Sequence, residues 1–306
     1  MTRLNRFLFL PGLLMVVAAI PAQEQPKAEA RKPLIPADAT VLRDIVYGPH
    51  ERNKLDLYVP KSNAPLPLVI WVHGGGWEMG SKFGGGPSLA LLNKGYAVAS
   101  INYRLSRDAV FPAQIEDCKE AVRWLRSNAK ERNLDPDHFG AWGMSAGGHL
   151  VALLGTTDDT AFTNGSERKN VTSRVQAVCD WFGPSDFLHW GLVKATDPIA
   201  QRPSAISRLL GGLVPDKMDL AKQASPVTYV SKNCPPFLIY HGEKDPIVPL
   251  QQAEALYEAL KKAGVDSTLH VLDGAGHGGP KFGAAAVLDE EEAFFAKYLK
   301  AKNSAK

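Results

Sequence analysis

The segment that most constrains the fold is residues 139–149, Phe-Gly-Ala-Trp-Gly-Met-Ser-Ala-Gly-Gly-His. The residues before Gly143 look like a short buried strand, and those after Ser145 look like a helix. The G-x-S-x-G pattern therefore falls at a sharp turn from strand to helix, where small residues avoid collisions with the neighbouring backbone. The serine hydroxyl is held at the edge of the sheet, beside helix N–H groups that favour negative charge. This context predicts that Ser145 is a nucleophile, although the bare five-residue pattern more often forms a turn without chemistry.

Short apolar runs alternate with helical patterns from residue 66 onward. Strands are predicted at residues 66–72, 96–102, 138–142, 175–182, 236–240 and 268–272. Helices are predicted at residues 88–93, 111–129, 146–154, 206–210, 251–262 and 285–299. The alternation predicts an α/β fold with a mostly parallel, doubly wound sheet, and residues 41–47 and 54–59 are expected to form an antiparallel hairpin at its edge. Ligands of such sheets bind outside the carboxyl ends of the strands.

One main domain is expected after two N-terminal segments, because 306 residues that are 45% hydrophobic can fill one large core. Residues 1–22 have two arginines before an apolar run, which predicts a signal peptide and hence an exported, periplasmic or extracellular protein. The alternative is an uncleaved anchor, but the run is shorter than the ~20 residues that a membrane span needs. Residues 23–40 are expected to form a linker. The domain is predicted over 41–302, with a cap insertion at about 185–232, which is long for a simple connection.

Composition gives no sign of a nucleic-acid partner, because the formal net charge is only +3. No stable membrane anchor is expected, and the oligomeric state is left open. Three cysteines are present, Cys118, Cys179 and Cys234. At least one of them lacks an internal partner, and the first two lie in apolar patterns where cysteine packs as a small hydrophobe. We therefore expect no essential disulfide.

A serine hydroxyl is a weak nucleophile and needs a base, usually a histidine that is held by a carboxylate. His277 lies in a glycine-rich turn after the strand at 268–272, which can bring its imidazole to the serine. Asp245 follows the strand at 236–240 and precedes His277, which gives the chain order serine, aspartate, histidine. Asp186, which follows another predicted strand, is the rival acid.

Glycines 74–76 follow a predicted strand and offer backbone N–H groups that no side chain covers. Such groups can point at a carbonyl oxygen as negative charge collects on it, together with the N–H after the nucleophile, here Ala146. The other use of such glycines is to hold a phosphate, but the chain has neither a Walker A lysine nor a G-x-G-x-x-G pattern. We expect no cofactor and no metal. His73 and His149, which flank these motifs, are expected to have structural roles.

Five motifs stand in order along the chain: His73-Gly74-Gly75-Gly76-Trp77, Asn102-Tyr103-Arg104-Leu105, Phe111-Pro112-Ala113, Gly143-Met144-Ser145-Ala146-Gly147-Gly148 and His241-Gly242-Glu243-Lys244-Asp245. Together they resemble the α/β-hydrolase esterases related to hormone-sensitive lipase, over roughly residues 40–300. The tryptophan after the glycines and the segment Asp245-Pro246-Ile247-Val248-Pro249 are most similar to the bacterial acetyl esterase and feruloyl esterase branch.

The resemblance implies an α/β-hydrolase fold and a serine carboxylesterase that uses a catalytic triad. It assigns the nucleophile to Ser145, the base to His277, its orienting acid to Asp245, and the oxyanion donors to Gly75, Gly76 and Ala146. The amide of Trp77 is a further candidate donor, because some relatives use the amide at that position. An exported enzyme that acts on plant polysaccharide esters would fit the same analogy.

Aromatic residues near the ends of the predicted strands suggest the substrate class. We expect Trp77, Trp181 and Phe182 to line the site, with Phe187 and Trp190 opening the cap. Bulky rings beside the nucleophile should shorten the acyl pocket, which favours acetyl-type esters of carbohydrates or a feruloyl group. Any of these rings could instead pack the cap onto the sheet.

Two other function classes remain possible from the sequence. The same fold serves as a non-catalytic binding protein when its triad is broken, but here all three triad candidates are present. A serine exopeptidase or an arylformamidase-type amidase would use the same machinery on an amide. The expected partner is therefore a small-molecule or polysaccharide ester, with amide hydrolysis as the alternative.

Overall fold

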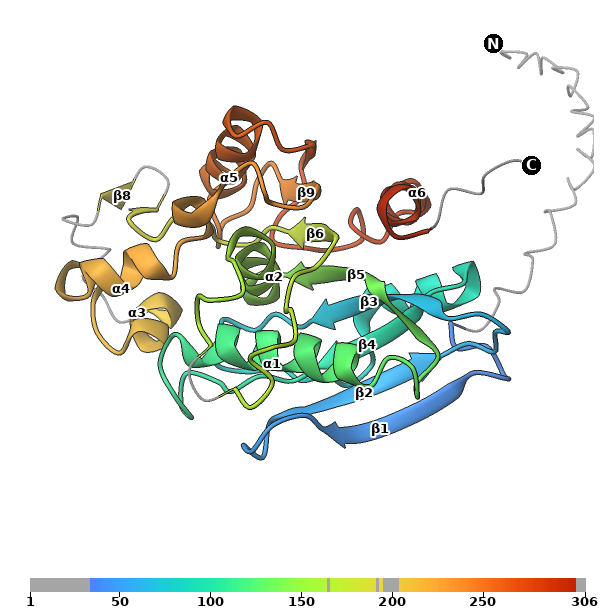
Figure 1. Ribbon diagram of the computed structural model, residues 1–306. Coiled ribbons are helices and arrows are strands. Elements are labelled where there is room, and N and C mark those ends of the chain that lie inside the picture. The colour runs from blue at the N-terminus through green and yellow to red at the C-terminus, as the bar shows by residue number, and fades with distance from the viewer. Residues whose placement is uncertain (1–33, 164–165, 191–192, 195–203, 301–306) are drawn as a thin grey trace, which may run out of the picture. The chain divides into compact units, whose positions relative to one another are not determined.

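Figure 1 shows the computed structural model of the chain, which describes residues 34–163, 166–190, 193–194 and 204–300. The predicted signal peptide at residues 1–22 lies outside the described residues, as do residues 23–33 of the predicted linker. Within the described ranges, no helix is both long enough and apolar enough to cross a membrane.

A sheet of eight strands forms the centre of the described domain. Its strands are β1 (Thr40–Val46), β2 (Lys54–Val59), β3 (Leu66–Val72), β4 (Ala97–Ile101), β5 (Leu134–Met144), β6 (Ala177–Trp181), β9 (Phe237–Gly242) and β10 (Ser267–Leu272). Their order across the sheet is β1-β2-β4-β3-β5-β6-β9-β10. The pairs β1–β2 and β2–β4 are antiparallel, and the other pairs are parallel. The predicted mostly parallel sheet with an antiparallel edge hairpin is confirmed.

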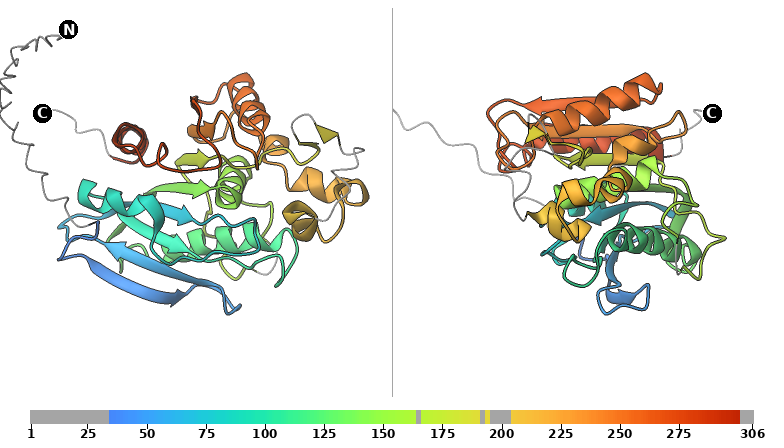
Figure 2. Two further views of the ribbon diagram at one scale, coloured as in Figure 1. Left: turned by 180° about the vertical axis from the view of Figure 1, so that it is seen from behind. Right: turned by 90° about the vertical axis from the view of Figure 1, so that its left-hand side faces the viewer.

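Helices pack on both faces of the sheet, as Figures 1 and 2 show. They are η1 (Gly86–Lys94, a 3₁₀ helix), α1 (Ala113–Ser127), α2 (Ala146–Thr156), α5 (Gln251–Lys262) and α6 (Ala285–Leu299). One core contains side chains of α1, α2 and α5, and the other contains those of η1 and α6. Successive strand residues alternate between the two cores, so Ile70 joins the first and Val69 the second. This two-sided burial explains why the central strands are continuous apolar runs.

Strand β5 begins four residues before its predicted start at residue 138. Leu134 pairs with Leu66 of β3 across an irregularity in the register, which adds the polar residues Asp135 and Asp137 to the strand. The apolar pattern could not show this extension, because Asp135 and Asp137 are not buried and lie between the paired residues Leu134 and Phe139.

The stretch predicted as a cap connects β6 to β9. Its described elements are β7 (His189–Trp190), β8 (Val193–Lys194), α3 (Ala205–Leu210), η2 (Val214–Asp216), α4 (Met218–Gln223) and η3 (Pro226–Tyr229). Figures 1 and 2 place α3 and α4 beyond the carboxyl ends of the central strands. The carbonyl of Leu209 in α3 accepts a hydrogen bond from the N–H of Phe111 at 2.8 Å, which ties the cap to the segment before α1.

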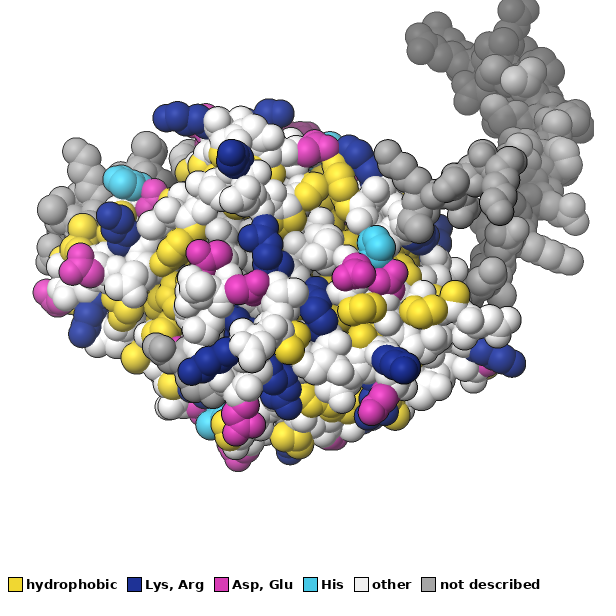
Figure 3. Space-filling model, viewed as in Figure 1, with side chains coloured by type: hydrophobic (Ala, Val, Ile, Leu, Met, Phe, Trp, Pro, Cys, Tyr) yellow, Lys and Arg dark blue, Asp and Glu magenta, His cyan; other side chains and the backbone are white. Residues whose placement is uncertain are grey.

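The cysteines and the surface charges can be compared with the expectations from composition. All three cysteines are free thiols, and Cys118 and Cys179 each lie in one of the two cores. On the face drawn in Figure 3, basic and acidic side chains are interspersed.

Candidate active site

Ser145 stands at the turn between β5 and α2, with φ 54° and ψ −120°. A non-glycine residue adopts such angles only where its surroundings impose them. Here the N–H of Ser145 donates to the carbonyl of Trp181 at 2.8 Å, which ties the turn to strand β6. A Cβ atom at Gly143 would lie 2.3 Å from the carbonyl oxygen of Gly147, and one at Gly147 would lie 2.1 Å from that of Val72. Only glycine fits these two positions.

Side chains from three turns meet at this point. The hydroxyl oxygen of Ser145 lies 2.8 Å from Nε2 of His277, and Nδ1 of His277 lies 2.7 Å from Oδ2 of Asp245. Asp245 follows β9 and His277 follows β10, and these neighbouring parallel strands end at the same edge of the sheet. The side chain of Asp245 is fully buried, whereas that of His277 is 15% exposed. The imidazole can therefore take the serine proton while the buried carboxylate orients the ring.

The environment of Asp245 keeps its carboxyl group ionised. Burial by itself raises the pKa of Asp245, but hydrogen bonds from His277 and from the N–H groups of Val248 and Ile247 outweigh burial and hold this pKa below its usual range. The two amides donate to Oδ1 at 2.9 and 2.8 Å. His241 packs beside the pair with Nε2 2.8 Å from the Val248 carbonyl, and burial lowers the pKa of His241. Because His241 is neutral, it does not compete with His277 for the negative charge of Asp245.

Asp186, the rival acid, lies in a separate turn after β6. Its Oδ2 is 2.8 Å from Nδ1 of His189, and its Oδ1 accepts the N–H groups of Leu188 and His189. The carboxylate thus caps its own turn rather than reaching His277.

The glycine loop after β3 lies directly against the serine turn. A Cβ atom at Gly74 would be 2.8 Å from the carbonyl oxygen of Met144 and 3.3 Å from Cβ of Ser145. A Cβ atom at Gly75, where φ is 110°, would be 2.3 Å from the carbonyl oxygen of Met79. These contacts require glycine because the loop must approach two other backbone segments closely.

The three predicted oxyanion donors are Gly75, Gly76 and Ala146. Among the residues that the structure describes, none accepts a hydrogen bond from the N–H of any of the three, or from the amide of Trp77. Gly76 and Ala146 both line the cavity next to Ser145. Amides that are free of internal partners and lie beside a nucleophile are suited to stabilise negative charge on a substrate oxygen.

His73 fixes the start of this loop. Its Nδ1 lies 2.7 Å from the carbonyl oxygen of Gly74, and its ring stacks on Tyr103 with centroids 4.4 Å apart. Burial lowers the pKa of His73 to about 4, so the ring is neutral near pH 7. Within the described ranges, no group of three or more histidine, cysteine, aspartate or glutamate side chains is placed to hold a metal ion.

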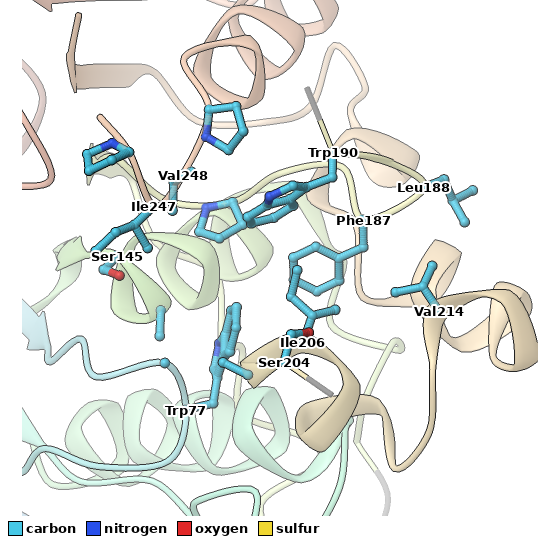
Figure 4. Close-up of a pocket in the computed structure, with 16 residues that line it drawn as sticks. Trp77, Ser145, Phe187, Leu188, Trp190, Ser204, Ile206, Val214, Ile247 and Val248 are labelled. Atoms are coloured by element: carbon cyan, nitrogen blue, oxygen red, sulfur yellow. The ribbon is translucent and has the colours of Figure 1, made fainter. Parts of the chain in front are cut away.

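A cavity of about 480 Å³ opens beside Ser145 (Figure 4). Most of its wall is apolar, and it includes Trp77, Phe187, Trp190, Ile206, Val214 and Ile247. In Figure 4, Ser145 stands at one end of the cavity, and Leu188 and Val214 stand at the other. Cavities of this size with few polar groups are typical of small-molecule sites. No sequence pattern marks Ile206, Val214 or Ile247 as cavity residues, although Ile247 belongs to the segment Asp245-Pro246-Ile247-Val248-Pro249.

Trp77 lines this cavity, but Trp181 and Phe182 do not, in contrast to the expectation from sequence. Trp181 is only 5% exposed, and its Nε1 donates to the carboxylate of Glu291 on α6. Side chains alternate along a strand, and this alternation turns Trp181 into the core shared with α6. Phe182 is fully buried, with its ring centroid 4.6 Å from that of His277. These two rings therefore lie in the core next to the site and not in the wall of the cavity.

Comparisons with known proteins show which proteins this chain is similar to. The family model BD-FAE matches residues 55–260. Esterase LipQ of Mycobacterium tuberculosis is 35% identical over 261 residues, which cover 80% of this chain and 60% of LipQ. The chain spans about half to three fifths of the length of the first curated relatives that it matches.

Solved structures are similar over more of their length. A truncated carbohydrate esterase from gut microbiota has a TM-score of 0.76 and 31% identity, with 86% of this chain and 98% of that chain covered. The butyrate-bound esterase Est2 of Thermogutta terrifontis has a TM-score of 0.69 and 26% identity, with 85% and 94% covered. Because the family model spans most of the domain that carries the serine turn and Asp245, the chain belongs to the BD-FAE family.

Proposed function

We propose that this protein is a serine carboxylesterase that hydrolyses short acyl esters through Ser145, His277 and Asp245. The observation that carries the proposal is the chain of two hydrogen bonds, 2.8 and 2.7 Å long, that connects the serine hydroxyl to the buried carboxylate. The names of the relatives, which include esterases and a carboxylic ester hydrolase, support the same reaction class.

The first half of the reaction forms an acyl-enzyme. Oγ of Ser145 attacks the ester carbonyl carbon while its proton passes to Nε2 of His277. Negative charge collects on the carbonyl oxygen, where the N–H groups of Gly75, Gly76 and Ala146 stabilise it. The tetrahedral intermediate then collapses, the bond to the alcohol oxygen breaks, and His277 gives its proton to the leaving alcohol.

The second half repeats these steps with water. His277 takes a proton from the water as its oxygen attacks the acyl carbon, and the same amides receive the charge on the oxygen. The bond to Oγ of Ser145 then breaks, and the proton returns to the serine. Asp245 stays ionised throughout and stabilises the imidazolium that forms twice in the cycle.

The proposed substrates are short, acetyl-type esters on a carbohydrate or an aromatic compound. One structural neighbour is a carbohydrate esterase, and another is an esterase with butyrate bound. The apolar cavity beside Ser145 provides contacts for an aromatic ring, with Trp77, Phe187 and Trp190 in its wall. Residues 1–22 support export of the protein, so that a polysaccharide ester outside the cytoplasm is a suitable natural target.

The role of Ser145 can be tested by substitution and by covalent labelling. Replacing Ser145 with alanine is expected to lower kcat by about 10⁴-fold or more, because members of a triad act as a unit. An organophosphonate should label the peptide that contains Ser145 in the wild type. The matched control is Ser62→Ala, in the loop between β2 and β3, where the hydroxyl hydrogen-bonds to the backbone of Ala64; it should retain wild-type turnover. Labelling at another residue, or near-normal turnover by Ser145→Ala, would rule out the proposed function.

The substrate class can be tested with p-nitrophenyl esters of increasing chain length in the presence of EDTA. We expect kcat/KM to be highest for acetate, lower for butyrate and insensitive to EDTA. Each methylene group in an apolar pocket changes the free energy of binding by roughly 1 to 3 kcal/mol. The preference for one acyl chain length should therefore be steep. An aminoacyl p-nitroanilide serves as the amide probe. A maximum at octanoate or longer, or faster hydrolysis of the anilide, would contradict the proposed specificity.

A further inference from the structure

His149 lies one turn into helix α2, and the proposed mechanism does not use it. Its backbone N–H donates to the carbonyl of Ser145 at 3.0 Å, and its side chain is fully buried. Nδ1 lies 3.1 Å from Nε1 of Trp77, and Nε2 lies 2.7 Å from the carbonyl oxygen of Ala224. One imidazole thus connects the serine helix, the glycine loop and the cap, because Ala224 is the C-cap residue of helix α4.

These two partners fix the protonation of the ring. An indole N–H can only donate, so Nδ1 of His149 accepts; a carbonyl can only accept, so Nε2 carries the proton. Burial lowers the pKa of His149 to about 4, although the hydrogen bond to Ala224 acts in the opposite direction. The ring is therefore neutral near pH 7, which keeps Nδ1 available to Trp77.

Trp77 needs such a partner because its backbone is strained. Its φ is 60°, directly after Gly75 at 110° and Gly76 at 61°. A bulky residue in the left-handed region persists only where the surrounding structure holds it. The indole packs edge-on against His149 and Phe187, with centroid distances of 5.3 and 5.7 Å. The hydrogen bond to His149 adds the directional contact that fixes this ring.

We propose that His149 is a positioning residue for the oxyanion hole: through the side chain of Trp77 it sets the direction of the Gly75 and Gly76 amides, and through Ala224 it links them to the cap. This inference rests on the proposed esterase function. It goes beyond the triad because it gives a role in transition-state stabilisation to a buried histidine that does not line the cavity beside Ser145.

The alternative is a histidine that only fills the core. A core-filling residue affects the folding free energy and leaves turnover by the folded enzyme unchanged. A positioning residue for the oxyanion hole affects kcat more than KM, because the amides bind the developing charge more strongly than the neutral carbonyl. The ratio of the two kinetic effects therefore separates the roles.

Two conservative variants separate the two hydrogen bonds of the ring. In His149→Gln, the amide nitrogen can take the place of Nε2 and donate to Ala224, but the acceptor for Trp77 is lost. In His149→Asn, the amide oxygen can take the place of Nδ1 and accept from Trp77, but the donor to Ala224 is lost. We expect His149→Gln to lower kcat for p-nitrophenyl acetate by about 100-fold with KM changed less than about threefold, since small misplacements of catalytic groups have effects of this size. His149→Asn should recover most of this loss.

Leu153→Ala is the matched control, because Leu153 is a fully buried residue of the same helix. It should lower Tm without lowering kcat of the folded enzyme. Trp77→Phe removes the indole N–H and keeps an aromatic ring, so it tests the same bond even if His149→Gln fails to fold. The double variant Trp77→Phe/His149→Gln should lose no more kcat than either single variant, because both break one interaction.

Unchanged kcat in folded His149→Gln and Trp77→Phe would overturn the inference. A loss of kcat in Leu153→Ala as large as that in His149→Gln would also overturn it. So would a loss in the double variant that equals the product of the two single-variant losses. These outcomes leave the proposed function intact if Ser145→Ala is inactive. Activity in Ser145→Ala would instead overturn the proposed function itself, whatever the His149 variants do.

Discussion

Two aspartate–histidine pairs stand at the carboxyl ends of neighbouring strands, and their local geometry is almost the same. Nδ1 of His277 lies 2.7 Å from Asp245 after β9, and Nδ1 of His189 lies 2.8 Å from Asp186 after β6. In each turn, Oδ1 of the aspartate also accepts two backbone N–H groups. The hydrogen bond within a pair therefore does not distinguish a catalytic pair from a structural one.

Burial and the third partner do distinguish them. The side chains of Asp245 and His277 are 0% and 15% exposed, whereas those of Asp186 and His189 are 16% and 79% exposed. The other ring nitrogen of His277 meets Ser145, while the ring of His189 extends into solvent. Charge interactions are stronger in a buried setting, and water screens them at an exposed one. The same two residue types thus form a buried pair that reaches Ser145 in one place and an exposed cap of a turn in the other.

The largest expected difference between the pairs lies in their histidines. His277→Ala should lower kcat by about 10⁴-fold or more, because the serine loses its base. His189→Ala should leave kcat within about twofold, because surface substitutions away from the site have small effects. Both are measured on p-nitrophenyl acetate. Comparable losses in the two variants would mean that the exposed pair also takes part in turnover.

The next difference concerns the two carboxylates. Asp245→Asn should lower kcat by about 10⁴-fold while the fold stays intact, through loss of the imidazolium partner and of the correct tautomer. Asp186→Asn should be mild, with its effect confined to the stability of its turn. Circular dichroism checks the fold of both variants. The reverse ranking in folded proteins would assign the acid role to Asp186.

The smallest expected effect is a pH dependence of stability. The pKa of Asp245 in the folded protein lies below its usual range, because the hydrogen bonds that it accepts outweigh its burial. Its carboxylate therefore stabilises the fold above the unfolded-state pKa of about 3.9, and this contribution is lost as the pH falls through the folded-state value. Urea unfolding of wild type and Asp245→Asn should show a free-energy difference at pH 7 that shrinks toward pH 3. A difference that grows on acidification would contradict this assignment.

Local patterns in the sequence were enough to predict much of the fold. Strands β2 and β3 and helices α5 and α6 have the predicted bounds, because burial on the faces of one sheet produces the apolar periods that were used. The serine turn was predictable for the same reason, since the collisions at Gly143 and Gly147 involve backbone within the turn and the adjacent strand.

The partners of the serine turn depended on contacts that no local pattern records. Asp245 and His277 are 32 residues apart, and His277 and Ser145 are 132 apart. The sequence indicated these residues as candidates. However, no local pattern distinguished the turn at Asp245 from the turn at Asp186, and only packing in the folded chain buries the side chain of Asp245 completely.

The residues that line the cavity show most clearly what the sequence could not predict. The sequence by itself determined that aromatic residues end strand β6 and follow the glycine loop. Only the tertiary structure decided that Trp77 faces the cavity while Trp181 faces the core beneath α6. A strand of period two has two equivalent faces, and which of them borders the cavity depends on the helices and the cap that cover each side.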